Sequence, residues 1–92
     1  MGERRFNPEI AKIAREKIGE AIVIRRKELG YSQLKLAREA NISEVRVIDV
    51  EQGRTDYRID TLLAIMGVLR MHVDFYGSDP NTPAGFAEQN MN

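Results

Sequence analysis

The 92-residue sequence contains no cysteine and only one histidine, His72. The absence of cysteine excludes a disulfide framework, a thiol nucleophile and a thiolate metal site, and one histidine cannot form a histidine-rich metal site. The sequence also lacks carboxylate pairs at a catalytic spacing, a nucleophile with a partner histidine and a glycine-rich phosphate loop. We therefore expect a protein that is not an enzyme and that uses no metal and no cofactor.

Long apolar runs are missing as well. No segment approaches membrane-spanning length, and the charged residues Glu3, Arg4 and Arg5 are not followed by the apolar core of a signal peptide. With 42% hydrophobic and 30% charged residues, the composition is that of a globular chain with room for one small core. We expect a single-domain cytoplasmic protein that does not associate with membranes.

The net charge is zero, but the charges are unevenly distributed. Residues 1–30 carry eight Lys or Arg against five acids, residues 31–58 carry five of each, and residues 59–92 carry one Arg against four acids. Neutrality counts against strong non-specific binding to nucleic acid, because contacts to phosphate supply most of that affinity. The uneven distribution still permits a local basic surface on a neutral protein.

The first helix is marked by its cap. Asn7 followed by Pro8 predicts a helix that extends to about Leu29, where Gly30 supplies a left-handed end. Gly19 is a candidate break between an N-terminal helical extension, residues 1–17, and the first helix of the domain. The apolar residues of this helix form an interrupted stripe that consists of Ile10, Ile13, Ala14, Ile18, Ala21, Ile22 and Leu29.

Two short helices follow. Ser32 predicts the cap of a helix that ends near Ala40, and Ser43 predicts the cap of a helix that ends at Gly53, with Asn41 in the tight turn between them. The apolar residues of the pair have helical spacing and are Leu36, Ala37, Ile42, Val47 and Val50. This pattern is typical of a helix-turn-helix, a motif that can place its second helix in the major groove of DNA.

The C-terminal third predicts one more helix and one strand. Asp60 is a candidate cap for a fourth amphipathic helix, and residues 71–76 alternate apolar and polar side chains as a strand does. A lone strand cannot satisfy its own backbone, so we expect it to pair with the same strand of a second copy, with Met71, Val73 and Phe75 at the interface of a homodimer. Residues 77–92 have too few apolar side chains to fold, which predicts a flexible tail.

Several residues match the pattern of one known family, namely Arg26, Gly30, Ser32, Gln33, Leu36, Ala37, Ile42, Ser43, Val50, Glu51, Gly53, Asp60, Thr61, Leu62 and Leu63. From Ile18 to about Val73 the chain resembles the phage-repressor-like, or XRE-type, helix-turn-helix family. The resemblance implies an all-α, lambda-repressor-like bundle of four to five helices, with the DNA-binding domain over residues 18–70. It also implies a structural ion pair between Arg26 and Glu51.

The same resemblance implies a set of DNA-binding residues. The residue at the position of Gln33 bonds a DNA phosphate in this family, Lys35 lies beside it, and Arg54 and Thr55 fall in a loop that contacts the phosphate backbone. The recognition helix, residues 43–52, carries the candidates for contacts in the major groove, which are Ser43, Glu44, Val45, Arg46, Ile48 and Asp49. Carboxylates can accept from cytosine N4, and aliphatic side chains can pack on thymine methyl groups.

The sequence therefore predicts a transcriptional regulator, a repressor that binds double-stranded DNA at an inverted-repeat operator as a homodimer. Two alternatives remain. A fourth helix followed by a strand is similar to HipB-type antitoxins, which implies a toxin protein as a further partner. Zero net charge and two acids on the recognition helix, Glu44 and Asp49, instead favour a protein-interaction module with the same fold but no DNA affinity.

Overall fold

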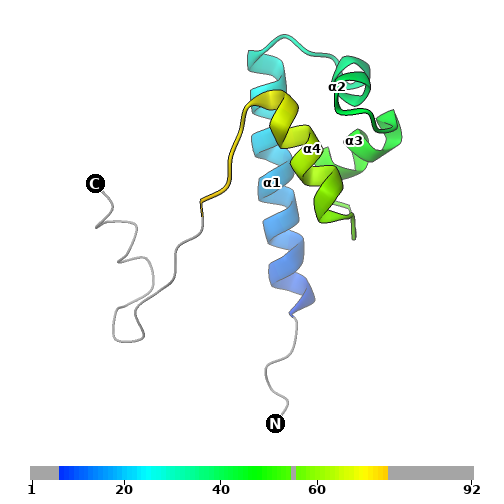
Figure 1. Cartoon of the computed structure of the whole chain (residues 1–92). Helices are drawn as coiled ribbons and strands as arrows, with labels where there is room; N and C mark the ends of the chain where they lie inside the picture. Colours follow the sequence, from blue (N-terminus) through cyan, green and yellow to red (C-terminus); the bar gives the residue numbers. More distant parts are fainter. Residues whose placement is uncertain (1–6, 55, 75–92) are drawn as a thin grey trace, which may run out of the picture.

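A computed structural model of the chain describes residues 7–54 and 56–74, which form four helices. They are α1 (Pro8–Glu28), α2 (Gln33–Ala40), α3 (Glu44–Glu51) and α4 (Ile59–Leu69). Helices α2, α3 and α4 gather on one side of α1, whose first turns extend beyond them (Figure 1). The predicted all-α fold class is confirmed.

The starts of the first three helices follow the predicted cap chemistry. The side chain of Asn7 accepts two backbone N–H groups from the first turn of α1. Ser32 Oγ accepts the N–H of Lys35 at 3.0 Å, and Ser43 Oγ accepts the N–H of Arg46 at 3.2 Å. These bonds satisfy donors that have no carbonyl partner within their helix. Helices α2 and α3 therefore begin directly after the serines that were predicted to cap them.

The start of α4 differs from the prediction. Arg58 occupies the cap position of α4 and makes no side-chain cap hydrogen bond. Asp60, expected as the cap, lies in the first turn of the helix instead. The expectation was wrong because a carboxylate is also favourable inside the first turn, where it faces the positive end of the helix dipole.

Gly19 does not break α1, which is continuous from Pro8 to Glu28. Gly19 is buried, and a Cβ built on it would collide with the backbone carbonyl of Glu51 at the end of α3. The glycine thus allows two helix backbones to approach each other more closely than any side chain would permit. Its role is packing rather than interruption of the helix.

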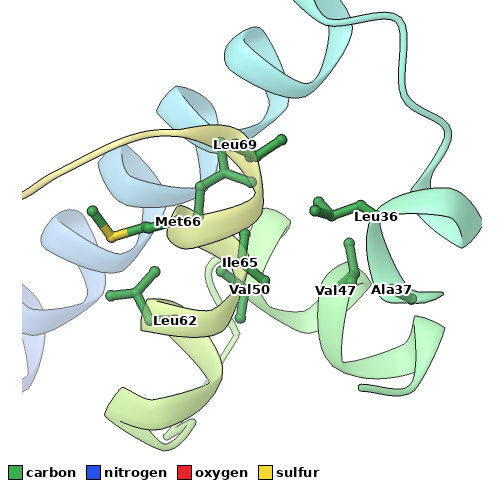
Figure 2. Packing of buried hydrophobic residues seen from close by; sticks show 9 residues of the cluster. Leu36, Ala37, Val47, Val50, Leu62, Ile65, Met66 and Leu69 are labelled. Atoms are coloured by element: carbon green, nitrogen blue, oxygen red, sulfur yellow. The ribbon is translucent and has the colours of Figure 1, made fainter. Parts of the chain in front are cut away.

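The core lies between α2, α3 and α4 and the second half of α1. The side chains of Leu36, Val47 and Ile65 point toward one another from three helices (Figure 2). The complete buried cluster comprises Ile22, Leu36, Ala37, Val47, Val50, Leu62, Ile65, Met66 and Leu69. Only Ile22 comes from α1, so most of the apolar stripe predicted on that helix is not a core face.

The strand predicted over residues 71–76 is absent from its described part. Residues 71–74 have no regular secondary structure, and Met71 and Val73 instead line an apolar groove between α1 and α4. The expected strand needs the same strand of a second copy to complete its hydrogen bonds, so the paired strand of a homodimer stays a prediction. Phe75, the predicted tail and residues 1–6 lie outside the described residues.

The close contact at Gly19 predicts that Gly19→Ala lowers the free energy of unfolding by about 1–3 kcal/mol, because the added methyl group has no space. Gly67→Ala is the matched control: Gly67 also lies within a helix, but a Cβ there meets nothing within 4 Å. That substitution should raise the free energy of unfolding by about 0.5–1 kcal/mol. Urea denaturation followed by circular dichroism measures both, and equal effects would contradict the packing role.

Candidate nucleic-acid interface

A buried ion pair joins α1 to the end of α3. Arg26 Nε donates to Glu51 Oε2 at 2.6 Å, and Arg26 Nη2 donates to Glu51 Oε1 at 3.2 Å. The two side chains are 11% and 3% exposed. Arg26 Nη1 also donates to the carbonyl oxygen of Tyr31 in the loop before α2, at 2.8 Å. Bidentate pairing and this third bond satisfy a charge that would be costly to bury alone.

Gln33 connects α2 to the same pair. Its Nε2 donates to Glu51 Oε1 at 2.9 Å, so Glu51 receives hydrogen bonds from both α1 and α2. The amide of Gln33 has two N–H groups, and this bond uses one of them. The other remains for a further acceptor at the start of α2, where first-turn backbone N–H groups also favour an anion. Gln33, the residue expected to bind a phosphate, is therefore positioned by its hydrogen bond to Glu51.

The face of α3 that points away from the core carries the predicted contact residues. Glu44, Val45 and Arg46 are exposed, whereas Ile48 and Asp49 are half-buried. Val45 exposes 64% of its surface, a large fraction for a β-branched apolar side chain on a short helix. Exposed and buried positions follow one another at helical spacing, so a single face of α3 remains available to a partner.

The acids on this face do not all stand alone. Arg54 Nη1 lies 3.3 Å from Asp49 Oδ1, so the loop after α3 supplies a cation to one of the two carboxylates. Glu44 makes no ion pair with another described residue. The sequence alone does not show this pair, because it depends on the turn at Gly53, which has φ +68°.

Cations on α2 and α3 contribute unequally to the surface charge. Lys35 Nζ lies 3.7 Å from Glu39 Oε2 and 4.9 Å from the ring centroid of Tyr31. Arg38 and Arg46 are exposed and form no ion pair with any described residue. These two arginines are therefore the cations of the α2–α3 surface whose charge is least compensated.

A polar hollow of about 390 Å³ lies between α3 and the start of α4, and its lining residues are Arg46, Asp49, Asp56, Tyr57, Arg58 and Thr61. Burial raises the pKa of Tyr57, and the nearby charge of Arg15 opposes this shift in part. The phenol is thus protonated at neutral pH and can donate a hydrogen bond. Arg58, which the sequence did not single out, places a second arginine beside the recognition helix.

Some of the predicted site residues do not lie on the α2–α3 surface, and one falls outside the described residues. Thr55 falls outside the described residues. Met71 and Val73, expected at a dimer interface, lie in the apolar groove against α1 and α4. Within residues 7–54 and 56–74 no cluster of three or more potential metal ligands is present, and no helix is long and apolar enough to cross a membrane.

The buried pair generates a stability prediction. Glu51→Ala leaves the guanidinium of Arg26 buried without a carboxylate and should lower the free energy of unfolding by about 3–5 kcal/mol. Lys12→Ala is the control, since the Lys12–Glu16 pair is 67% and 48% exposed and should contribute less than about 1 kcal/mol. Denaturant unfolding measures both values. A loss for Glu51→Ala as small as that for Lys12→Ala would refute the structural role of the pair.

Comparison with known families agrees with this geometry. The helix-turn-helix family model HTH_3, which is of the XRE type, matches residues 22–76. The match includes the end of α1, all of α2, α3 and α4, and therefore both members of the Arg26–Glu51 pair. No curated protein matches the chain. Because the family model covers more than half of the sequence, the chain belongs to the HTH_3 family of helix-turn-helix proteins.

Proposed function

We propose that the protein is a sequence-specific transcriptional regulator, a repressor that binds an inverted-repeat operator as a homodimer. Membership of the HTH_3 family supports DNA as the partner and is typical of regulators that are not enzymes. The observation that carries the proposal is the outward face of α3. It presents Val45, with 64% of its surface exposed, beside Arg46, which forms no ion pair with a described residue.

The rigid attachment of α3 to the rest of the fold supports its assignment as the DNA-binding helix. The bonds from Arg26 and Gln33 to Glu51 fix the last residue of α3 against α1 and the start of α2. A helix held in this way can place its side chains against base edges without a large loss of conformational freedom on binding. We assign base contacts to the exposed residues of α3, with Val45 on thymine methyl groups and Glu44 on cytosine N4.

Contacts to the phosphate backbone come from the elements around α3. The free N–H of the Gln33 amide and the start of α2 form one anchor. Arg38 on α2 provides a further cation on the flank of α3. Arg58 beside the polar hollow provides another, and its Nη2 lies 3.7 Å from Asp60 Oδ2 in an exposed pair. Arg54 lies beside Asp49, so this carboxylate approaches DNA with a cation next to it.

A protein-interaction module is the second candidate. The specific observation in its favour is that Val45 is exposed and Ile48 lies half-buried on the same helix, an apolar pair that could also pack against a protein. The antitoxin alternative rests on a strand after the fourth helix that pairs with a second copy, and residues 71–74 form no strand in the single chain. The toxin partner stays a prediction.

Selection of bound sequences from a random double-stranded DNA library tests the proposal. Enrichment of an inverted repeat with half-sites about 34 Å apart is the expected result, together with affinity that falls as salt concentration rises. Absence of any enriched sequence at low salt would exclude the regulator and leave the interaction module.

Arg46→Ala should weaken binding to the selected operator by about 1–3 kcal/mol without lowering thermal stability, because the side chain is exposed and makes no described ion pair. Lys12→Ala removes an exposed cation of α1, outside the predicted contact residues, and should leave the affinity unchanged. Fluorescence anisotropy with labelled operator measures both. Equal affinities for the two variants would show that Arg46 takes no part in binding.

A further inference from the structure

One row of exposed side chains on α1 has no role in the core or in the proposed DNA-binding face. We call it the α1 seam, and it consists of Ile10, Ile13, Lys17, Glu20, Ile24 and Lys27. Successive members are three or four residues apart in strict alternation, which is the spacing of the contact positions in a two-helix coiled coil. The three isoleucines expose 64%, 55% and 60% of their surfaces.

The α1 seam faces away from α3. Gly19 marks the side of α1 that touches α3, since it meets the backbone of Glu51. At 3.6 residues per turn, Ile24 and Ile10 lie about 140° and 180° around the helix from Gly19. A partner bound to the seam therefore leaves the outward face of α3 exposed.

We propose that the α1 seam binds the α1 seam of a second copy of this chain, with the two helices antiparallel. The proposal rests on the proposed function, which requires two copies related by a twofold axis. With that axis between residues 18 and 19, Ile13 faces Ile24 of the second copy and Lys17 faces Glu20 of the second copy. Twofold symmetry repeats both contacts, so the four central positions of the seam are complementary to themselves. The same register sets Ile10 against Lys27, whose aliphatic stem can pack on it.

The charges in the seam select this occupant and this direction. Neither Lys17 nor Glu20 forms an ion pair with a described residue of its own chain. A parallel pair would place Lys17 against Lys17 and Glu20 against Glu20, and like charges in contact repel. Only the antiparallel arrangement brings each of these charges against its opposite.

The extent of the surface also fits a second copy. From Ile10 to Ile24 the seam is about 21 Å long. Beside it, Ile18 and Ala21 line the apolar groove of about 490 Å³ whose other wall includes Leu63, half exposed, on α4. The groove therefore adds apolar surface next to the seam that a second copy can cover.

Sedimentation equilibrium of the full chain without DNA tests the proposal. The wild-type chain should be dimeric, and Ile24→Glu should raise the dimer dissociation constant by about 100-fold or more, because it places an unpaired carboxylate in the interface. Val45→Glu is the matched control: the side chain is equally apolar and 64% exposed, but it lies on α3. It should abolish operator binding and leave the dimer intact.

Charge reversal tests the pairing of Lys17 with Glu20. Lys17→Glu should weaken the dimer because two carboxylates then face each other, and adding Glu20→Lys in the same chain should restore it. A merely destabilising effect of the first substitution would not be reversed by the second. Absence of restoration would therefore overturn the proposed register.

Cross-linking tests the direction of the helices, and the natural chain contributes no competing cysteine. A mixture of Ile13→Cys and Ile24→Cys chains should form a disulfide-linked heterodimer under mild oxidation. Neither variant should cross-link alone, since identical residues lie about 16 Å apart along the antiparallel pair.

Three results would contradict the proposal that the α1 seam is the dimer interface. None of them bears on DNA binding, which the library selection tests separately. The first is a monomeric wild-type chain. The second is self-cross-linking of the Ile13→Cys chain, which would indicate parallel helices. The third is a dimer that Val73→Asp dissociates and Ile24→Glu does not, which would place the interface on the segment after α4.

Discussion

The arrangement of the helices depends on one buried ion pair. Arg26 comes from α1 and Glu51 from α3, and their charges are satisfied by each other, by the carbonyl of Tyr31 and by the amide of Gln33. Because an unpaired charge in this position is strongly unfavourable, α1, the start of α2 and the end of α3 have essentially one arrangement that satisfies every group. Gly19 allows it by letting the backbones touch. The orientation of α3 is thus fixed by its contacts with α1 and with the start of α2.

This arrangement explains how a chain with no net charge can present a surface to DNA. Opposite charges are paired locally, with Asp49 beside Arg54 and Lys35 beside Glu39, while Arg38 and Arg46 keep their charges uncompensated among the described residues. We expect such a surface to bind non-specific DNA weakly, since few phosphates are neutralised, and to depend on base contacts for its affinity. Selectivity rather than strength is the property that this distribution favours.

Local chemistry could be predicted from the sequence, and long-range pairing largely could not. The caps at Ser32 and Ser43 follow from residues a few positions apart, and the core positions on α2 and α3 follow from helical spacing. The Asp49–Arg54 pair and the place of Arg58 beside α3 depend on the path of a loop that no periodicity describes. The strand over residues 71–76 was inferred from alternation alone, and alternation does not supply a neighbouring strand. Ile10, Ile13 and Ile22 were part of one predicted stripe on α1, but only the fold shows that Ile22 is buried while Ile10 and Ile13 stay exposed.

The central claim is that α3, held by the Arg26–Glu51–Gln33 network, is the element that meets DNA. The most direct test is a two-dimensional ¹H–¹⁵N NMR titration of the full chain with its selected operator. The account predicts that the largest shift changes fall on residues 44–49 and on the side-chain amide of Gln33. Changes confined to α4 and the apolar groove, with α3 and Gln33 unaffected at saturation, would contradict it.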